Sequence, residues 1–259
     1  MRNETTHGVL YNVYVKSGDL YALYQEKSMN KVLREEKKFL ISQTEFFKIS
    51  HDLENILHLD PHSGALGYTV RSLYFDTIHD GDYFEKSDGV ELRKKIRLRI
   101  YHPTDDYAML EMKQKQGSMQ LKRSLRVERA DAILMTKGDY SPLLKYENDF
   151  ASECYALMHM KGYRPKTIVE YKRKAFIAKE NRIRITFDHE INATESCFDL
   201  FGENLIMNPV MDRQRVILEV KYNNFLLEYI KRVLNQASKS ELSVSKYVLA
   251  RQTGYLTRL

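Results

Sequence analysis

The feature that most constrains the fold is a regular alternation of aliphatic and charged residues that recurs in several separate segments. In the segment 95–101, the even positions are Ile or Leu, and the odd positions are Lys95, Arg97, Arg99 and Tyr101. The alternation is found in the segments 36–41, 95–101, 110–115, 121–128, 182–188 and 218–221. A period of two is typical of strands with two unlike faces. The sequence therefore predicts an antiparallel sheet with one apolar face and one charged face.

Two arrangements of the charged face are open. It can lie in water while the apolar face packs on helices, which is the common arrangement. Alternatively, the charged faces point at one another in a closed barrel with a charged lumen. The charged positions are rich in Arg, Lys and Glu and contain few Ser, Thr, Asn or Gln residues. This composition favours the barrel, so we expect an α+β fold with an antiparallel β-barrel tunnel and helices packed outside.

A charged lumen of this kind needs a partner. Two like charges about 4 Å apart repel by roughly 4 kcal/mol at an effective dielectric near 20. Lys and Arg number 41 against 35 Asp and Glu, and the sequence pI is near 9.0. A chain of phosphates would match the excess cations, because each unit carries negative charge and several acceptor oxygens. Carboxylates among phosphate-binding cations are also suited to hold Mg²⁺ or Mn²⁺, which prefer oxygen ligands.

Helices are predicted outside the alternating segments. Ser42 and Glu45 form a capping box, and apolar residues recur at helical spacing from there towards Pro61. Further helices are expected over 148–161, 224–236 and 242–251. Residues 1–33 are predicted to be an N-terminal extension of unknown role, and residues 34–259 to form one domain.

The sequence also bears on location. No run of about 18 apolar residues occurs, so no transmembrane segment is expected. The two cysteines, Cys154 and Cys197, cannot form a disulfide framework, which favours a reducing compartment. We therefore expect a cytoplasmic protein.

Short motifs along most of the chain match a known family in the family's order. They are the segments 34–41, 72–77, 95–101, 111–113, 122–123, 171–176, 182–188, 219–221 and 245–247. On these residues the chain resembles the polyphosphate-polymerase domain of the vacuolar transporter chaperone (VTC) complex, within the triphosphate tunnel metalloenzyme superfamily. The family usually has a histidine where this chain has Glu35, whose strand parity predicts that it points out of the lumen.

The resemblance implies an eight-stranded antiparallel barrel and a Mn²⁺- or Mg²⁺-dependent transfer of the γ-phosphate of ATP to a growing polyphosphate chain. The catalytic residues that it implies are Arg97, Arg99, Arg173, Arg184 and Lys246. The phosphate-binding residues are Lys38, Lys113 and Lys122, and the metal-binding residues are Glu219, Glu36 and Glu111. ATP and polyphosphate are the expected partners, nucleic acid is not expected, and a separate membrane partner is compatible with the lack of a transmembrane segment.

Other functions remain open at this stage. The same scaffold could serve a tripolyphosphatase, another nucleoside triphosphatase, a thiamine-triphosphatase-like hydrolase or a nucleotide cyclase. A non-catalytic sensor of polyphosphate or an inositol phosphate is another alternative. A nucleic-acid-binding module would need the cations on an outer face beside exposed aromatic residues. The charged residues occupy alternate positions and so lie together on one face of the predicted sheet. Tyr101 is the only aromatic residue that clearly lies in a row with them, which argues against a nucleic-acid-binding module.

Overall fold

The computed structural model describes residues 34–64, 67–117, 119–238 and 245–256. The predicted N-terminal extension, residues 1–33, lies outside the described residues. The strands are β1 (Arg34–Ser42), β2 (His58–Leu59), β3 (Tyr68–Asp76), β4 (Leu92–Ile100), β5 (Tyr107–Gln116), β6 (Met119–Glu128), β7 (Arg164–Ile177), β8 (Arg184–Thr194), β9 (Asn208–Pro209) and β10 (Arg215–Asn223). All six alternating segments fall within these strands, apart from residues at their ends, so the predicted period is confirmed.

One sheet contains all the strands. Its order is β1-β10-β8-β7-β3-β4-β5-β6, with β2 beside β7 and β9 beside β8. The pairings of β3 with β4 and β7, of β4 with β5, of β5 with β6, and of β8 with β7 and β10 are antiparallel. The expected α+β class with an antiparallel sheet is thus confirmed.

The expected closed barrel is not formed by the described residues. The hydrogen-bonded order has two ends, β1 and β6, and these strands do not pair with each other. The sheet is nevertheless strongly curled. Six strand spacings separate β1 from β5, about 29 Å in a flat sheet, yet Lys113 Nζ on β5 lies 3.5 Å from a carboxylate oxygen of Glu36 on β1. The charged face therefore encloses a lumen without a continuous ring of backbone hydrogen bonds.

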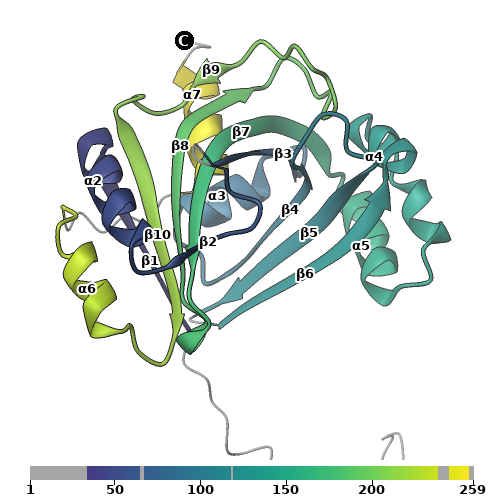
Figure 1. Cartoon of the computed structure of the whole chain (residues 1–259). Coiled ribbons are helices and arrows are strands. Elements are labelled where there is room, and N and C mark those ends of the chain that lie inside the picture. The colour runs from purple at the N-terminus through teal and green to yellow at the C-terminus, as the bar shows by residue number, and fades with distance from the viewer. Residues whose placement is uncertain (1–33, 65–66, 118, 239–244, 257–259) are drawn as a thin grey trace, which may run out of the picture. The chain divides into compact units, whose positions relative to one another are not determined.

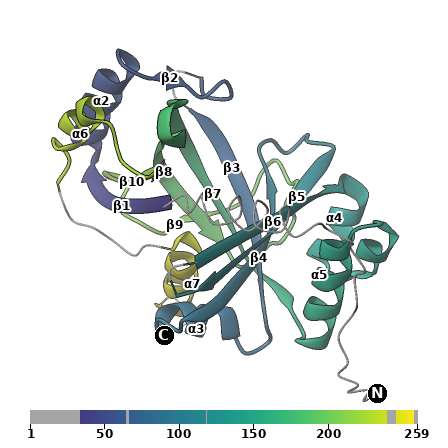
Figure 2. The same ribbon diagram turned by 90° about the horizontal axis from the view of Figure 1, so that it is seen from below.

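Helices cover the apolar face on two flanks (Figures 1 and 2). The helices are α2 (Gln43–Glu54), α3 (Gly81–Ser87), α4 (Arg129–Thr136), α5 (Asp149–Met160), α6 (Glu228–Leu234) and α7 (Lys246–Leu256), with 3-10 turns η1 (Ser141–Lys145) and η2 (Glu180–Arg182). On one flank, α2 and α6 cover β8 and β10, and the core includes Ile49, Phe187 and Leu218. On the other flank, α4 and α5 cover β4 to β6, and the core includes Leu98 and Met158.

The helix predictions were right in kind and differed in their bounds. The capping box at the start of α2 is present, because Ser42 Oγ accepts from the Glu45 amide and the Glu45 carboxylate accepts from the Ser42 amide. Helix α5 falls within the predicted 148–161, with Asn148 as its N-terminal cap, whereas α6 is shorter than the expected 224–236. The predicted last helix, 242–251, runs instead as α7 from Lys246 to Leu256. Helices α3 and α4 were not predicted, because they are too short to show a clear helical spacing of apolar residues.

Helix α7 lies against the inner face rather than outside. Tyr247 is almost fully buried in a third apolar cluster with Tyr74 and Tyr171, which belong to β3 and β7. Its hydroxyl donates to the carboxylate of Asp76 at 2.5 Å. Asp76 is fully buried at the end of β3 and also accepts from the amides of the first turn of α3. These contacts fix the start of α7, and thus Lys246, beside the lumen.

Candidate functional site

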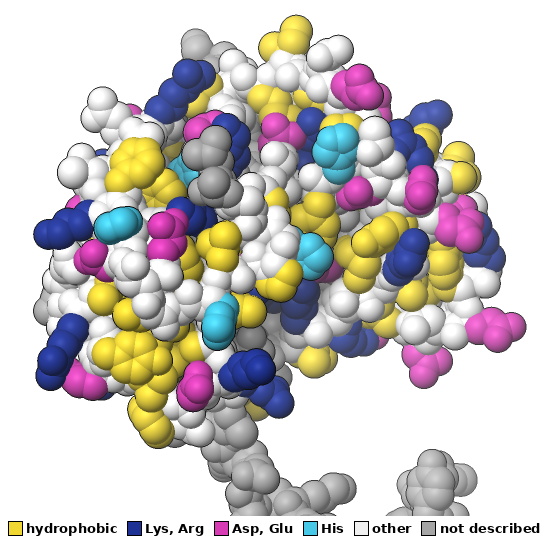
Figure 3. Space-filling model, in the orientation of Figure 1, with side chains coloured by type: hydrophobic (Ala, Val, Ile, Leu, Met, Phe, Trp, Pro, Cys, Tyr) yellow, Lys and Arg dark blue, Asp and Glu magenta, His cyan; other side chains and the backbone are white. Residues whose placement is uncertain are grey.

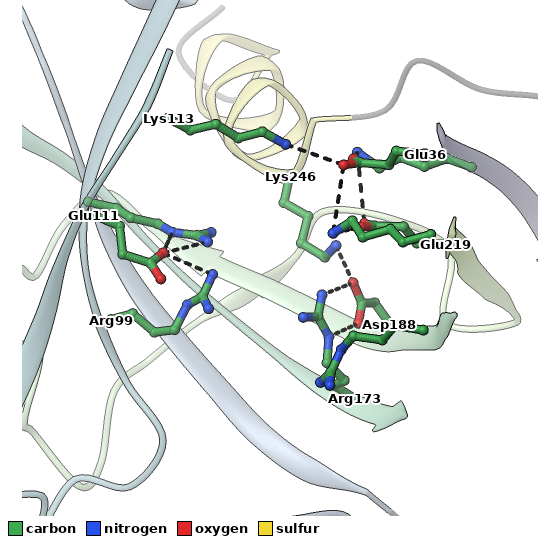
Figure 4. Close-up of polar contacts among 12 residues, drawn as sticks. Glu36, Arg99, Glu111, Lys113, Arg173, Asp188, Glu219 and Lys246 are labelled. Carbon is green, nitrogen blue, oxygen red and sulfur yellow. Dashed lines mark hydrogen bonds and ion pairs between the residues drawn. The ribbon is translucent and has the colours of Figure 1, made fainter. Parts of the chain in front are cut away.

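The charged lumen is the candidate functional site, and its side chains come from almost every strand of the curled sheet. The cations described there are Lys38 from β1, Lys95, Arg97 and Arg99 from β4, Lys113 from β5, Lys122 from β6, Arg173 from β7, Arg184 from β8, Lys221 from β10 and Lys246 from α7. The carboxylates described there are Glu36, Asp60, Glu111, Asp188 and Glu219. The lumen thus has twice as many of these cations as carboxylates. Figure 4 shows how most of them converge from opposite walls.

The first group is the Glu111 cluster, formed by Glu111, Arg97, Arg99 and Lys122. Arg97 binds the Glu111 carboxylate through Nε and Nη2, each at 2.8 Å, and Arg99 approaches the same oxygen at 3.2 Å. Lys122 Nζ lies 2.5 Å from the other oxygen. Burial alone would raise the pKa of Glu111, but Arg97 and Lys122 outweigh it and lower the pKa. One carboxylate therefore holds three cations in place along β4, β5 and β6.

The second group is the Glu36–Glu219 cluster, formed by Glu36, Glu219, Lys38, Lys113 and Lys221. Lys38 Nζ lies 2.8 Å from Glu36 and 3.8 Å from Glu219. Lys221 also contacts both carboxylates, and Lys113 reaches Glu36 from β5 across the lumen. Burial works against ionisation of Glu36, but Lys221, Lys38 and Lys113 together lower its pKa to about 2. Two ionised carboxylates thus share the same lysines.

The third group is the Asp188 cluster, formed by Asp188, Arg173 and Lys246. Arg173 makes a bidentate pair with Asp188, with distances of 2.6 and 2.8 Å. Lys246 Nζ from α7 lies 2.5 Å from the same carboxylate. Asp188 is fully buried, which would raise its pKa, but Arg173 and Lys246 hold the pKa far below its usual range. The bidentate geometry fixes the plane of the Arg173 guanidinium.

Arg184 lies apart from these groups, at the first residue of β8. Its Nη1 lies 2.6 Å from the Asp60 carboxylate, and its Nη2 donates to the Tyr68 hydroxyl at 3.2 Å. About a third of the Arg184 side chain is exposed, more than for Arg99 or Arg173. Arg184 therefore faces solvent at the rim while the other arginines are enclosed.

The structure brings the predicted site residues together in part. The predicted phosphate-binding cations all contact lumen groups, but they fall into the separate clusters described above. Of the predicted metal-binding acids, Glu36 and Glu219 are neighbours through shared lysines, whereas Glu111 belongs to a different cluster. Glu35 points outward as predicted, because its carboxylate accepts from Tyr222 in the outer core.

Several lumen residues were not among the predicted site residues, although the alternation places three of them on the charged face. Asp188 alternates in step with Arg184, Lys221 with Glu219, and Lys95 with Arg97. Asp60 carried no signal, because it follows the two-residue strand β2 and reaches the lumen only through the fold.

The lumen has the chemistry of a polyphosphate or triphosphate site. Each carboxylate is held by cations whose donors could bind phosphate oxygens instead, and the excess of positive charge favours a polyanionic guest. On the outer face shown in Figure 3, cationic and acidic side chains are interspersed, and positive charge does not gather there. Among the described residues, none of the helices has the length and hydropathy needed to span a membrane.

The carboxylates of the lumen could also hold a divalent metal ion. Within the described residues, no group of three or more His, Cys, Asp or Glu side chains is arranged to hold a metal. Mg²⁺ often binds through only one or two carboxylates together with substrate phosphates and water. The pair of Glu36 and Glu219 fits that mode, since both are ionised and lie beside phosphate-binding lysines. Glu111 fits it less well, because three cations surround it.

Comparisons with known proteins identify the family of this chain and a solved structure with a similar fold. The sequence model of the VTC domain family matches residues 33–255. A proposed adenylyl cyclase from Hippeastrum, described as having a dominant triphosphatase activity, has a similar solved structure. Its TM-score is 0.50 at 14% identity, over 85% of this chain and 96% of that chain. A proposed adenylate cyclase from Bacillus halodurans has a TM-score of 0.48 at 13% identity, over 82% and 95% of the two chains. At such identities the likeness concerns the fold alone. A comparison with proteins of curated function found no significant match.

Proposed function

Because this chain belongs to the VTC domain family, we propose that it is a metal-dependent polyphosphate polymerase that transfers the γ-phosphate of ATP to a growing polyphosphate chain. The observation that carries the proposal is the convergence of cations from β1, β4, β5, β6, β7, β8 and α7 on one enclosed, cation-rich lumen. Phosphoryl transfer asks a protein mostly for positioning and for stabilisation of charge. A curled sheet with cations on facing walls supplies both.

In this proposal the arginines hold the reacting phosphates. Arg97, Arg99, Arg173 and Arg184 bind the β- and γ-phosphates of ATP, which displace part of the carboxylate contacts seen in the structure. Lys246 lies beside Asp188 and next to Ser245, which contacts Lys95 of β4, and it binds a further phosphate oxygen. Planar guanidinium groups suit this role because they bind phosphate oxygens in pairs.

The lysines of the two opposite walls bind the acceptor. Lys38, Lys113 and Lys122 contact the phosphates of the polyphosphate chain and bring its terminal phosphate to the γ-phosphate. A terminal phosphate oxygen then attacks the γ-phosphorus while the bond to the β,γ-bridging oxygen breaks. ADP leaves, and the chain becomes one phosphate longer.

Glu36 and Glu219 would hold Mn²⁺ or Mg²⁺ in the loaded enzyme. Such an ion supplies neutralisation of the negative charge that builds up on the phosphate oxygens. The protein's own contribution is to keep both carboxylates ionised, which Lys38 and Lys221 do in the described structure. Glu111 has a different role in this proposal, since it orients Arg97 and Arg99.

A triphosphatase is the second candidate function. Water in place of the terminal phosphate of the acceptor would give hydrolysis in the same lumen. The Hippeastrum protein with a similar fold is described as having a dominant triphosphatase activity. The two reactions share the proposed contacts to the phosphates of ATP and differ in the nucleophile.

Product analysis tests the proposal. The full chain is incubated with ATP and Mn²⁺, or with Mg²⁺ in parallel, and the products are resolved by gel electrophoresis and chromatography. Long-chain polyphosphate and ADP are expected. Arg97→Ala and Glu219→Ala should abolish the product, while Arg232→Ala, at an exposed position of α6, should not. ADP and phosphate without polyphosphate would identify a triphosphatase. Binding of ATP by the unaltered chain without any turnover would identify a sensor.

A further inference from the structure

Lys95 differs from the other lumen cations. It lies on β4 in the row of Arg97, and Lys113 is its direct partner on β5. Its Nζ lies 2.5 Å from Ser245 Oγ, next to the start of α7. Within the described residues, no carboxylate lies within ion-pair distance of Lys95, whereas carboxylates pair with Lys38, Arg97 and Lys113. The amine is therefore enclosed without an opposite charge.

The groups that face Lys95 are cationic. Burial is the largest influence on its pKa, and Lys86 from α3, Lys38 from β1, Lys113 from β5 and Arg97 from β4 add to it. Together they lower the pKa of Lys95 to about 7. Ser245 provides a neutral hydroxyl and no compensating charge. In the ligand-free protein at pH 8.5, the amine is thus mostly neutral.

We propose that Lys95 is an additional phosphate-binding residue, and that its amine takes up a proton from solvent when a polyphosphate or triphosphate enters the lumen. The anion supplies the negative charge that the protein does not place there. The protonated amine then donates to a phosphate oxygen. This inference rests on the proposed function only in that the lumen binds a phosphate chain, and it needs no turnover.

Protonation of Lys95 and binding of the polyanion favour each other, and this coupling sets the direction in which affinity changes with pH. A bound polyanion raises the proton affinity of Lys95, so binding is tightest below the pKa of the free protein and weakens as pH rises through it. A single linked proton changes affinity by at most about tenfold per pH unit. Arginine keeps its charge at every pH in this range, so Lys95→Arg should remove the dependence.

Isothermal titration calorimetry with tripolyphosphate tests the proposal on the full chain. Titrations are run at pH 8.5 without divalent metal, in two buffers with different ionisation enthalpies. The last ionisation of tripolyphosphate lies near this pH, so the ligand contributes protons of its own to the heat. That contribution is common to all variants, and the difference between variants reports the proton taken up by Lys95. We expect the unaltered chain to take up about half to one proton more than Lys95→Arg. Lys95→Met should bind about tenfold more weakly, and Lys137→Met, at an exposed position, should bind normally.

Thermal unfolding of the ligand-free proteins separates binding from a structural role. Lys95→Met should raise the melting temperature, because it replaces a partly buried amine that has no opposite charge beside it with an apolar side chain. A residue needed for packing would lower it. Equal proton exchange by the unaltered chain and Lys95→Arg on binding would overturn the inference and leave the proposed function standing. Failure of the unaltered chain to bind tripolyphosphate would overturn both, whereas proton uptake without any polyphosphate synthesis would contradict the polymerase alone.

Discussion

The two faces of the curled sheet are made by neighbouring residues of the same strands, yet their environments are opposite. On β4, Leu98 is fully buried under the helices of one flank. Arg97 and Arg99, on either side of it, face the lumen and keep 22% and 11% of their side chains exposed. Alternation thus separates two tasks at single-residue resolution. Outer residues hold the sheet in its curled form, and inner residues present charge to an anionic ligand.

The energetics of the two faces differ accordingly. Complete burial of an aliphatic side chain contributes about 2 kcal/mol to folding. An intact enclosed ion pair contributes little, because the cost of removing both charges from water offsets most of their attraction, but removal of one partner leaves the other charge unpaired and destabilises the fold. We therefore expect outer substitutions to act mainly on the free energy of unfolding. Inner substitutions should act on binding and turnover, and also on stability where they leave enclosed charges unpaired.

The largest expected effect lies on the inner face, at Glu219. Glu219→Gln keeps the shape of the side chain but removes one of the two carboxylates proposed to hold the metal. Turnover should fall about 1000-fold, the upper end of what loss of one charge-stabilising group costs. Steady-state rates over a range of Mn²⁺ concentrations are the measurement. A rate that excess Mn²⁺ fully restores would show that Glu219 affects only metal affinity.

Glu111→Gln is the matched inner control, because it removes a carboxylate that lies with three cations. Without it, Arg97, Arg99 and Lys122 lose their common partner and repel one another. The rate should fall by no more than about tenfold, and tripolyphosphate should bind more tightly, since the freed cations remain available. Equal losses in the Glu219 and Glu111 variants would erase the distinction between the two clusters.

The next effect belongs to the outer face. Leu98→Ala leaves a cavity in the core under α5 and should lower the free energy of unfolding by about 3 kcal/mol, measured by urea denaturation. Leu92→Ala, on the same strand but 66% exposed, is the control and should change it by less than about 1 kcal/mol. The turnover of folded Leu98→Ala should match that of the unaltered chain. A specific loss of turnover would mean that the outer face also positions the arginines.

The assignment of strand residues to the inner or the outer face was predictable from the sequence. Parity alone assigned Leu98 to one face and Arg97 and Arg99 to the other, because a strand places successive side chains on opposite sides. The capping box at Ser42 was predictable for a similar reason, since both hydrogen bonds join residues three apart. Local rules thus give the faces and the start of a helix.

What the sequence could not give depends on contacts between distant segments. Closure of the barrel was expected from the charge pattern, but β1 and β6 do not pair within the described residues. The grouping of acids was also hidden, because Glu36 meets Lys113 only through the curl of the whole sheet. Asp60 reaches Arg184 from a loop that carries no periodicity at all.

The pH dependence of stability provides a third test, which again concerns the inner face. The pKa of Glu36 is lowered to about 2 because three lysines outweigh burial, so its ionised form stabilises the folded chain. That contribution is complete above the usual pKa of about 4.5 and is lost as the pH falls from there towards 2. Glu36→Gln should therefore be less stable than the unaltered chain at pH 6, by about 2 kcal/mol. The difference should shrink steadily as the pH falls below 4.5.

Urea denaturation at a series of pH values measures this dependence, with Glu203→Gln as the exposed control. The control should follow the unaltered chain throughout. If the Glu36 variant is the more stable one at pH 6, then the lysines around Glu36 do not hold it in the ionised form, and the proposed readiness for a metal ion loses its basis.

The smallest expected effect is at Ser42, where β1 passes into α2 on the outer side. Ser42→Ala removes the hydroxyl that accepts from the Glu45 amide at 3.2 Å and leaves that amide without its cap. Loss of such a cap costs about 1 kcal/mol. Ser152→Ala, at an exposed position inside α5, should be neutral or slightly stabilising, because alanine is the better helix former. Because α2 packs on the outer core, the Ser42 variant should bind tripolyphosphate with unchanged affinity. A weaker affinity would show that the end of β1, and with it Glu36 and Lys38, depends on the cap, and the two faces would then be coupled.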